Sequence, residues 1–294
     1  MKRFLLIITV FCCTVAFYSC NLLNKEEKIP AYIQIDSLTY QGISPNMFTC
    51  AYVFVNYKLV GVFEPPRAIP VLVSGDAVVT VRPGIDLNGY TWERIIYQMS
   101  DISETRITLE PQKTHNINPV FSDLSSVHTV WLEDFEHSAI TLMAADSLTP
   151  QIKVVRNQRP GHTGYIGRIQ ITPDDTLTEK FDYEYYDSMP IYFQATPGYF
   201  EFSYKCNEPF EVRIKAYNIA NGELHDKTVL FTYKSPDIWK RMYINFATIV
   251  REMGPGFYYK PYFRIRRFPN TDQEDTMEDT VNVMLDDIRI VYLK

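Results

Sequence analysis

The sequence predicts an all-β chain of two modules, a small antiparallel β-sandwich followed by a larger two-sheet β-sandwich. Short apolar runs recur along the whole chain and are separated by Gly, Pro, Asn and Ser, as in antiparallel sheets. Tyr and Phe, which favour strands, number 21 and 18. Residues 113–126 are rich in Asn, Pro and Ser, a composition typical of a linker. We therefore expect a module boundary near residue 126, between modules at 32–126 and 127–294.

The first residues of the chain have the pattern of a secretory signal. Lys2 and Arg3 form a short positive region, and residues 4–17 are uncharged and apolar. A spanning helix needs roughly 20 apolar residues, so this run is too short to cross a bilayer as a helix. The pattern predicts a signal peptide at residues 1–19.

The residues that follow suggest how the mature chain is held. Phe17-Tyr18-Ser19-Cys20 resembles the bacterial lipoprotein signal in the looser form found in Bacteroidota. The resemblance implies that Cys20 carries a lipid and that residues 20–31 form a tether. Lys25-Glu26-Glu27 is similar to the signal that sends such lipoproteins to the outer leaflet of the outer membrane, which implies a surface-exposed position. The alternatives are a soluble secreted protein and a merely solvated tether.

Composition restricts the partners. The chain is 46% apolar and 22% charged, which is a globular composition. Its formal net charge is −6 and no basic run stands out, which argues against a nucleic-acid partner. Beyond Cys20 only Cys50 and Cys206 remain, and we interpret both as small buried hydrophobic residues.

The small module contains a run of strands and turns with a family resemblance. Residues 51–55, 59–62, 71–73 and 78–81 are predicted strands, with a turn at Asn56-Tyr57. This order of strand, tight turn, Gly, Pro, apolar strand and Gly turn resembles a PEGA-type module, a small surface β-domain. The family usually has Asp-Gly where this chain has Asn56-Tyr57. The resemblance implies a cell-envelope role without chemistry.

The large module has distinctive ends. It opens on Trp131-Leu132-Glu133-Asp134-Phe135-Glu136 and closes on Leu285-Asp286-Asp287-Ile288. These ends resemble a carbohydrate-binding-module-like jelly roll, in which the opening and closing strands lie close together. The implied fold is a jelly-roll-like β-sandwich. Strands are expected between the two ends, and a helical turn at 246–253. They are expected at 166–171, 191–193, 199–205, 210–217, 229–233, 240–246 and 258–266.

Carboxylates on the two terminal strands are candidate metal ligands. The jelly-roll resemblance would bring Glu133, Glu136, Asp286 and Asp287 together, where their oxygens could hold a structural Ca²⁺. The alternative is that alternate members face water on an edge strand. No cofactor other than this calcium is expected.

Clustered tyrosines are the candidate ligand contacts. Tyr183, Tyr185 and Tyr186 form one cluster. Tyr258 and Tyr259 belong to a second, at residues 256–262, which also includes Tyr262. Flat rings stack on sugar faces or anchor protein interfaces, but the same pattern also serves sheet packing. We place Trp239 in the core.

These features favour binding over catalysis. No two histidines stand at metal-ligand spacing, and no G-x-S-x-G motif occurs. The preferred function is a non-catalytic surface lipoprotein, a binding or scaffold subunit of an outer-membrane protein assembly with a protein partner. The alternative is a glycan-binding surface lipoprotein that uses the jelly roll. A glycan hydrolase of jelly-roll type is the third hypothesis.

Overall fold

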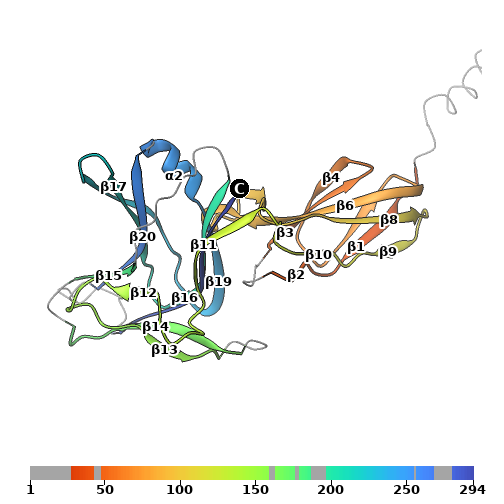
Figure 1. Ribbon diagram of the computed structural model, residues 1–294. Coiled ribbons are helices and arrows are strands. Elements are labelled where there is room, and N and C mark those ends of the chain that lie inside the picture. The colour runs from red at the N-terminus through yellow and green to blue at the C-terminus, as the bar shows by residue number, and fades with distance from the viewer. Residues whose placement is uncertain are drawn as a thin grey trace, which may run out of the picture.

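The computed structural model describes residues 28–42, 48–158, 163–175, 179–186, 197–254, 256–267 and 280–294. These residues form two groups of strands, β1–β10 and β11–β21, which lie side by side in Figure 1. The prediction of an all-β chain with two successive sandwiches is confirmed. The predicted signal peptide, Cys20 and the tether up to residue 27 lie outside the described residues, as does the predicted strand at 191–193.

The small module is built from three sheets around one core. Their strand orders are β5-β1-β9, β10-β2 and β4-β3-β6-β7, with β8 also pairing β6. Two pairings, β1 with β9 and β2 with β10, are parallel, although the sequence predicted an antiparallel module. The strands are β1 (Ala31–Ile35), β2 (Thr39–Tyr40), β3 (Cys50–Val55), β4 (Lys58–Phe63), β5 (Arg67–Val71), β6 (Gly75–Asp86), β7 (Arg94–Ile96), β8 (Ser103–Leu109), β9 (Thr114–Asn116) and β10 (Val120–Phe121), with the 3₁₀ helix η1 (Leu87–Gly89) between β6 and β7.

The parallel pairings correct one sequence interpretation. Residues 113–126 are not a free linker, because β9 and β10 lie within them and each completes a sheet. The polar composition of residues 113–126 did not reveal these strands, because a strand of two or three residues needs only one or two buried side chains, such as Phe121. The module boundary near residue 126 stays a prediction.

The β3–β4 hairpin follows from its turn chemistry. Asn56 and Tyr57 both have positive φ, 48° and 64°, as a two-residue hairpin turn of type I′ requires. The turn places Val53 and Val55 of β3 in the module core. Cys50 is buried as predicted, on the other side of β3. The PEGA-type resemblance of this region stays a prediction.

The large module is a sandwich of two sheets, which we call the front sheet and the back sheet. The front sheet has the order β12-β15-β20-β17-β18, and the back sheet has the order β13-β14-β21-β16-β19, with β11 also pairing β21. The strands are β11 (Val127–Glu133), β12 (Leu142–Ala144), β13 (Lys153–Arg156), β14 (Tyr165–Ile171), β15 (Lys180–Tyr185), β16 (Gly198–Cys206), β17 (Glu211–Asn218), β18 (Leu224–Phe231), β19 (Ser235–Asn245), β20 (Phe257–Arg266) and β21 (Val281–Leu293).

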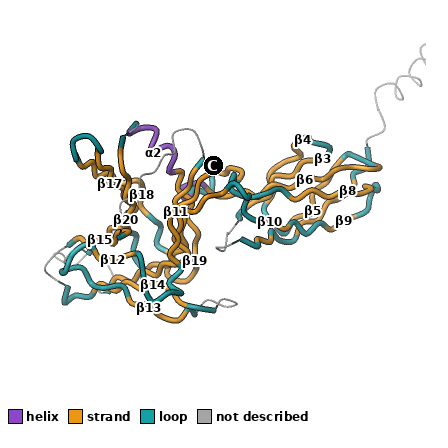
Figure 2. Tube along the Cα trace, viewed as in Figure 1, coloured by secondary structure: helices purple, strands orange, loops and turns teal. Residues whose placement is uncertain are grey.

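The opening and closing strands of this module pair directly, as expected from the ends of its sequence. β11 runs antiparallel to β21, with Val127 opposite Leu293 and Glu133 opposite Ile288. The helix α2 (Phe246–Met253) follows β19 and coincides with the predicted helical turn. Figure 2 shows how little helix accompanies the strands. In the described part of the chain, no helix is long and apolar enough to cross a membrane.

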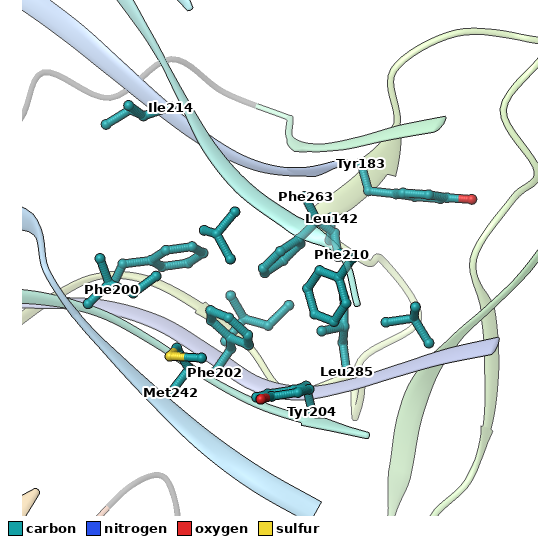
Figure 3. Close-up of a cluster of buried hydrophobic side chains, with 14 of the residues drawn as sticks. Leu142, Tyr183, Phe200, Phe202, Tyr204, Phe210, Ile214, Met242, Phe263 and Leu285 are labelled. Carbon is teal, nitrogen blue, oxygen red and sulfur yellow. The ribbon is translucent and has the colours of Figure 1, made fainter. Parts of the chain in front are cut away.

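Aromatic rings fill the space between the two sheets. Phe200 and Phe202 of β16 contact Phe263 of β20, with ring centroids 5.7 and 4.9 Å apart (Figure 3). Phe210 packs against the same ring at 5.7 Å. Cys206 is buried in this core as predicted and has a free thiol. The abundance of Phe is therefore explained mainly by packing between the sheets.

The two modules share a buried apolar interface. Ile85 and Tyr97 of the small module pack with Tyr199, Tyr243 and Val291 of the large one. The large-module residues lie on the outer side of the back sheet, because their neighbours Phe200, Ile244 and Ile290 point into the sandwich core. The small module therefore covers one half of the outer face of the back sheet.

A buried charge network crosses this interface. Arg289 donates from Nε to Glu201 Oε2 at 2.7 Å and from Nη2 to the Tyr97 hydroxyl at 2.7 Å. Tyr97 in turn donates to Glu201 Oε1 at 2.8 Å. The remaining nitrogen of Arg289 pairs with Asp123 of the small module at 3.1 Å. Arg241 adds a second contact to Glu201 at 3.1 Å.

The two central charges of the network are enclosed. The side chains of Arg289 and Glu201 are 1% and 0% exposed. Burial alone would lower the pKa of Arg289, but the surrounding groups, Glu201 above all, together outweigh this and hold that pKa well above its ordinary value. Burial raises the pKa of Tyr97, with Glu201 adding to the effect. Both groups keep their protons at any physiological pH, so the network is a permanent link between the modules.

Breaking this link should be costly. We expect Arg289→Met to lower the free energy of unfolding by about 3–5 kcal/mol, because it leaves buried carboxylates without their main partner. Urea unfolding measures the change. Lys227→Met is the control, since Lys227 and Glu252 are about half exposed and such pairs contribute at most about 1 kcal/mol. Equal unfolding free energies for the two variants would contradict the central role of Arg289.

Candidate ligand-binding face

The outer face of the front sheet carries a regular array of polar and aromatic side chains. Successive side chains of a strand point to opposite faces, so every second residue of β15, β17 and β20 leaves the core. We call this surface the front face. Its outward residues are Asp182, Glu184, Glu211, Arg213, Lys215, Tyr217, Tyr258, Lys260, Tyr262, Arg264 and Arg266.

Register places opposite charges side by side on this face. Glu184 forms ion pairs with Lys215 and with Lys260, the second at 3.0 Å. Arg264 donates two hydrogen bonds to Asp182, both at 2.7 Å, in the bidentate geometry that gives the strongest such pairs. These side chains are each less than one-fifth exposed, although they lie on the outside of a sheet. The front face is thus a closely packed polar surface.

Tyr262 lies at the centre of this array. Its hydroxyl donates to Asp226 Oδ1 at 2.7 Å and accepts from Arg213 Nε at 2.7 Å. Three cations flank its ring, with Lys215 Nζ 4.9 Å, the Arg264 guanidinium 5.4 Å and the Arg213 guanidinium 5.9 Å from the centroid. Burial, aided by the Asp226 hydrogen bond, raises the pKa of Tyr262, so the phenol stays protonated and can donate.

The charge state of the array is fixed by its own contacts. Burial alone would raise the pKa of Glu184, but hydrogen bonds from Lys215 and Lys260 outweigh it and hold that pKa below the ordinary value. The hydrogen bond with Asp182 raises the pKa of Arg264. Every donor and acceptor of these pairs therefore keeps one orientation and one charge near neutral pH.

Aromatic rings border the polar array. Tyr258 on β20 lies opposite Tyr217 on β17, and both point outward. Tyr186 follows the end of β15 on the same side, two residues after Glu184. Tyr186 and Tyr258 are 60% and 36% exposed, and Tyr217 is partly exposed. We call these three residues the tyrosine row.

The tyrosines predicted as ligand contacts divide into two groups. Tyr186 and Tyr258 belong to the tyrosine row. Tyr183 and Tyr259 point into the sandwich core, so the expectation that they contact a ligand is wrong. Tyr185 packs on Trp131 at 4.6 Å between ring centroids. The cause is the strand period: it puts Tyr183 and Tyr185 on one side, as expected, but that side faces the core.

Sequence reasoning missed Tyr217 and the charged residues around it, and it placed Tyr262 in an aromatic cluster without selecting it as a ligand contact. A signal was present, because polar and aromatic side chains alternate with apolar ones over 211–217 and 258–266. The pattern was used only to identify strands. The prediction that Trp239 lies in the core is wrong. Trp239 is partly exposed and lies on the outer side of the back sheet.

The four carboxylates predicted as calcium ligands have separate roles in the described structure. Glu133 is buried and accepts hydrogen bonds from the backbone N–H groups of Phe135 and Thr141. Glu136 accepts from the Tyr165 N–H at 2.7 Å. No group of three or more Asp, Glu, His or Cys side chains among the described residues is arranged to hold a metal ion. The calcium site stays a prediction without support from this geometry.

Asp286 is the unusual member of this set. It is 8% exposed, and its Oδ1 accepts from the Asp287 N–H at 2.9 Å. Burial raises its pKa to about 8, and the neighbouring charge of Asp287 adds to the effect. The Asp286 carboxyl is therefore protonated in the folded chain at neutral pH.

Comparisons with known proteins give the following likenesses. No family model and no curated protein matches the chain. A Clostridium thermocellum xylanase fragment with CBM22-1 and GH10 modules, solved with xylohexaose, has a TM-score of 0.37 at 10% identity over 55% of this chain, which spans 28% of that one. The CBM22-2 xylan-binding domain of Paenibacillus barcinonensis Xyn10C has a TM-score of 0.38 at 15% identity, with 54% of this chain and 97% of that one covered.

A third likeness covers most of both chains. A carbohydrate-binding module of the β-sandwich superfamily, described for its promiscuous specificity, has a TM-score of 0.42 at 11% identity over 92% of this chain and all of the other. All three TM-scores lie below 0.5, and all three identities are 15% or lower.

The raised pKa of Asp286 predicts a pH dependence of stability. The folded state keeps this proton up to about pH 8, whereas the unfolded chain loses it near the ordinary value of 3.8. The free energy of unfolding should therefore fall as pH rises from about 4 to about 8. Asp286→Asn cannot ionise, so we expect it to remove this slope and to be more stable than the wild type by roughly 3–5 kcal/mol at pH 9.

Urea unfolding at several pH values measures the effect. Asp237→Asn is the control, because Asp237 is exposed and its replacement should leave the slope unchanged. A wild-type chain whose Asp286-dependent stability is the same at pH 5 and pH 9 would contradict the assignment.

Proposed function

We propose that the chain is a non-catalytic, lipid-anchored surface protein whose large module binds a glycan chain across the front face. The observation that carries this proposal is the position of the tyrosine row beside an ordered array of donors and acceptors. A sugar has both chemical characters, since its ring faces are apolar and its hydroxyl groups need hydrogen-bond partners.

The polar array suits hydroxyl groups because it is already paired. Covering an unpaired charge would carry a desolvation penalty, whereas the charges of Glu184, Lys215 and Lys260 neutralise one another before any ligand arrives. Their remaining lone pairs and protons are held in fixed directions. Binding to such a surface loses little side-chain entropy, which is the advantage of preorganisation.

The tyrosine row supplies the apolar part of the contact. A Tyr ring offers a flat surface with few rotatable bonds, so it loses little entropy when a ligand covers it. The row lies across β15, β20 and β17, whose neighbours are about 4.8 Å apart, so the rings are distributed over roughly 10 Å. Such a span favours an oligomeric ligand over a single small molecule.

The membrane anchor is the second part of the proposal. It rests on the resemblance of the sequence before Cys20 to a Bacteroidota lipoprotein signal. The described chain begins at Lys28 and enters β1 at Ala31, so few residues separate the proposed lipid from the first strand. The glycan-binding module would then lie at the outer surface of the outer membrane.

A scaffold role in an outer-membrane assembly is the second candidate function, and one observation favours it. β4 is the edge of its sheet, and its apolar residues Leu59, Val60 and Val62 are 56%, 38% and 39% exposed. An apolar edge strand is a site where another chain can add a strand. Purification of the tagged chain from detergent-solubilised membranes tests this role, and recovery of no stoichiometric partner would count against it.

The tyrosine row provides the test of glycan binding. We expect Tyr217→Ala and Tyr258→Ala each to weaken binding to a neutral polysaccharide about ten-fold, which corresponds to ~1.4 kcal/mol. Affinity electrophoresis in gels containing soluble polysaccharides identifies a ligand, and calorimetry with the purified chain then gives the change. Tyr57→Ala is the matched control, because Tyr57 is 74% exposed but belongs to the small module. Equal effects of all three substitutions, or no binding to any neutral polysaccharide, would overturn the proposal.

The anchor has its own prediction. Wild-type chain expressed in a Bacteroidota host should sediment with the membranes and become accessible to added protease on intact cells. Cys20→Ala should release it into the soluble fraction, because the apolar segment before it is too short to hold the chain. Membrane-bound Cys20→Ala protein would show that the lipid is not the anchor.

A further inference from the structure

The half of the back sheet that the small module leaves uncovered contains a groove. It has a volume of about 440 Å³ and is lined from five of the six strands of the back sheet. We call it the basic groove. Its lining residues on strands are Val155 and Arg156 (β13), Ile166 and Arg168 (β14), Lys205 (β16), Asp237 and Trp239 (β19) and Met284 (β21). Gln158, which follows β13, completes the lining.

The charges of the basic groove are not balanced. Arg156, Arg168 and Lys205 face one carboxylate, Asp237. In the part of the chain that the structure describes, none of these three cations has an ion-pair partner. The contrast with the front face is sharp, since Lys215, Lys260 and Arg264 are all paired there. The groove is therefore a positive site on a chain whose formal net charge is −6.

Arg168 brings a buried donor to the groove. Its Nε is buried and has no hydrogen-bond partner among the described residues. Its Nη2 makes one long contact, 3.4 Å, to the Asn282 side-chain oxygen. A buried guanidinium N–H without a partner is unfavourable, and a carboxylate can satisfy two guanidinium N–H groups at once.

Trp239 gives the groove an aromatic surface. It is partly exposed, and Met284 lies in the same lining, so the floor is apolar although cations border it. Trp offers the largest flat ring of any side chain for stacking against a planar or ring-shaped group. Charge alone would not explain a Trp at this position, whereas a ring that carries an acidic substituent would use both features.

The backbone under the groove argues for a sugar over a peptide. β14, β21 and β16 are each paired on both sides, so the backbone groups beneath the middle of the groove are used within the sheet, and the groove meets a sheet edge at β13 and at β19. An extended peptide usually binds by adding to a free sheet edge through its own backbone. A polysaccharide needs only side-chain partners, which this groove supplies.

We propose that the basic groove binds an acidic polysaccharide. A sugar ring stacks on Trp239, and carboxylates of the chain pair with Arg168, Lys205 and Arg156. The groove crosses four strand spacings of about 4.8 Å, so it accommodates an oligomeric segment roughly 19 Å long. This site is separate from the front face, and it stands whether or not the front face binds a neutral glycan.

Binding of the purified mature chain to polygalacturonate tests the proposal. In calorimetry at about 0.15 M salt, we expect measurable binding that weakens as salt is raised, because exposed charges are screened. Neutral dextran should not compete at this site. Dextran sulfate distinguishes the acid group: binding as tight as that of polygalacturonate would assign the site to anionic sugars in general, while weaker binding would assign it to carboxylates.

Variants separate the aromatic and charge contributions. Trp239→Ala and Arg168→Ala should each weaken polygalacturonate binding about ten-fold, and Trp239→Phe should recover part of the loss because a ring remains. Lys227→Ala removes an exposed cation of β18 outside the groove and should leave binding unchanged. Circular dichroism checks that each variant is folded, and Trp239→Phe keeps the test decisive if Trp239→Ala unfolds.

Two outcomes would overturn the proposal. Poly-glutamate that binds as tightly as polygalacturonate would show that charge alone is recognised and that the site takes an acidic peptide. Polygalacturonate binding that is absent, or that is equal in wild type, Trp239→Phe and Arg168→Ala, would show that the groove is not its site. The two proposed sites can fail independently. Neutral-glycan binding that is lost in Tyr258→Ala but kept in Arg168→Ala supports the front-face site, whatever the result with polygalacturonate at the groove.

Discussion

The buried pair of Arg289 and Glu201 is the contact on which the arrangement of the molecule depends. Each is almost inaccessible, and each has partners in both modules, through Tyr97 for Glu201 and through Tyr97 and Asp123 for Arg289. If the modules separated, both side chains would lose partners, and water would have to hydrate their charges. The apolar interface around them excludes water, and the charges fix its orientation, because a hydrogen-bonded pair tolerates far less displacement than an apolar contact.

This docking divides the surface of the large module. Half of the outer face of the back sheet is used as the interface, and the other half remains open as the basic groove. The front face lies on the opposite side of the sandwich and takes no part in the docking. The two exposed faces differ in one physical respect: cations of the front face are paired with acids, and those of the groove are not. The same fold therefore presents one electrically balanced surface and one unbalanced surface.

Much of the fold could be predicted from the sequence. Short apolar runs located β3, β14, β16, β17 and β20 to within a residue or two. The resemblance of the ends of the large module to those of a carbohydrate-binding-module-like jelly roll predicted the pairing of β11 with β21. The candidate site was less predictable. Period-two alternation says that Tyr183 and Tyr185 share a side but does not say which side is buried. That choice is made by strands distant in sequence, such as β16, whose rings fill the core against β15 and β20.

Other failures have the same cause. Trp239 was predicted to lie in the core, yet β19 continues beyond the part of the sheet that the small module covers, and Asp237 and Trp239 near its start line the groove. Residues 113–126 have the composition of a linker, but two very short strands tie them into the small module. In each case the local signal was real, and a long-range contact that one sequence does not reveal decided the outcome.

The length of β6 has a consequence for where binding takes place. This strand has 12 residues, so it spans roughly 40 Å. Its first residue lies near the entry of the chain, where Ala31 pairs with Val71, and Ile85 near its other end enters the interface with the large module. The small module thus acts as a stiff stalk. If the chain is tethered at a membrane as proposed, the stalk and its fixed interface would hold both candidate binding faces at one height and tilt above the lipid headgroups, whereas a flexible linker would let their height and tilt vary.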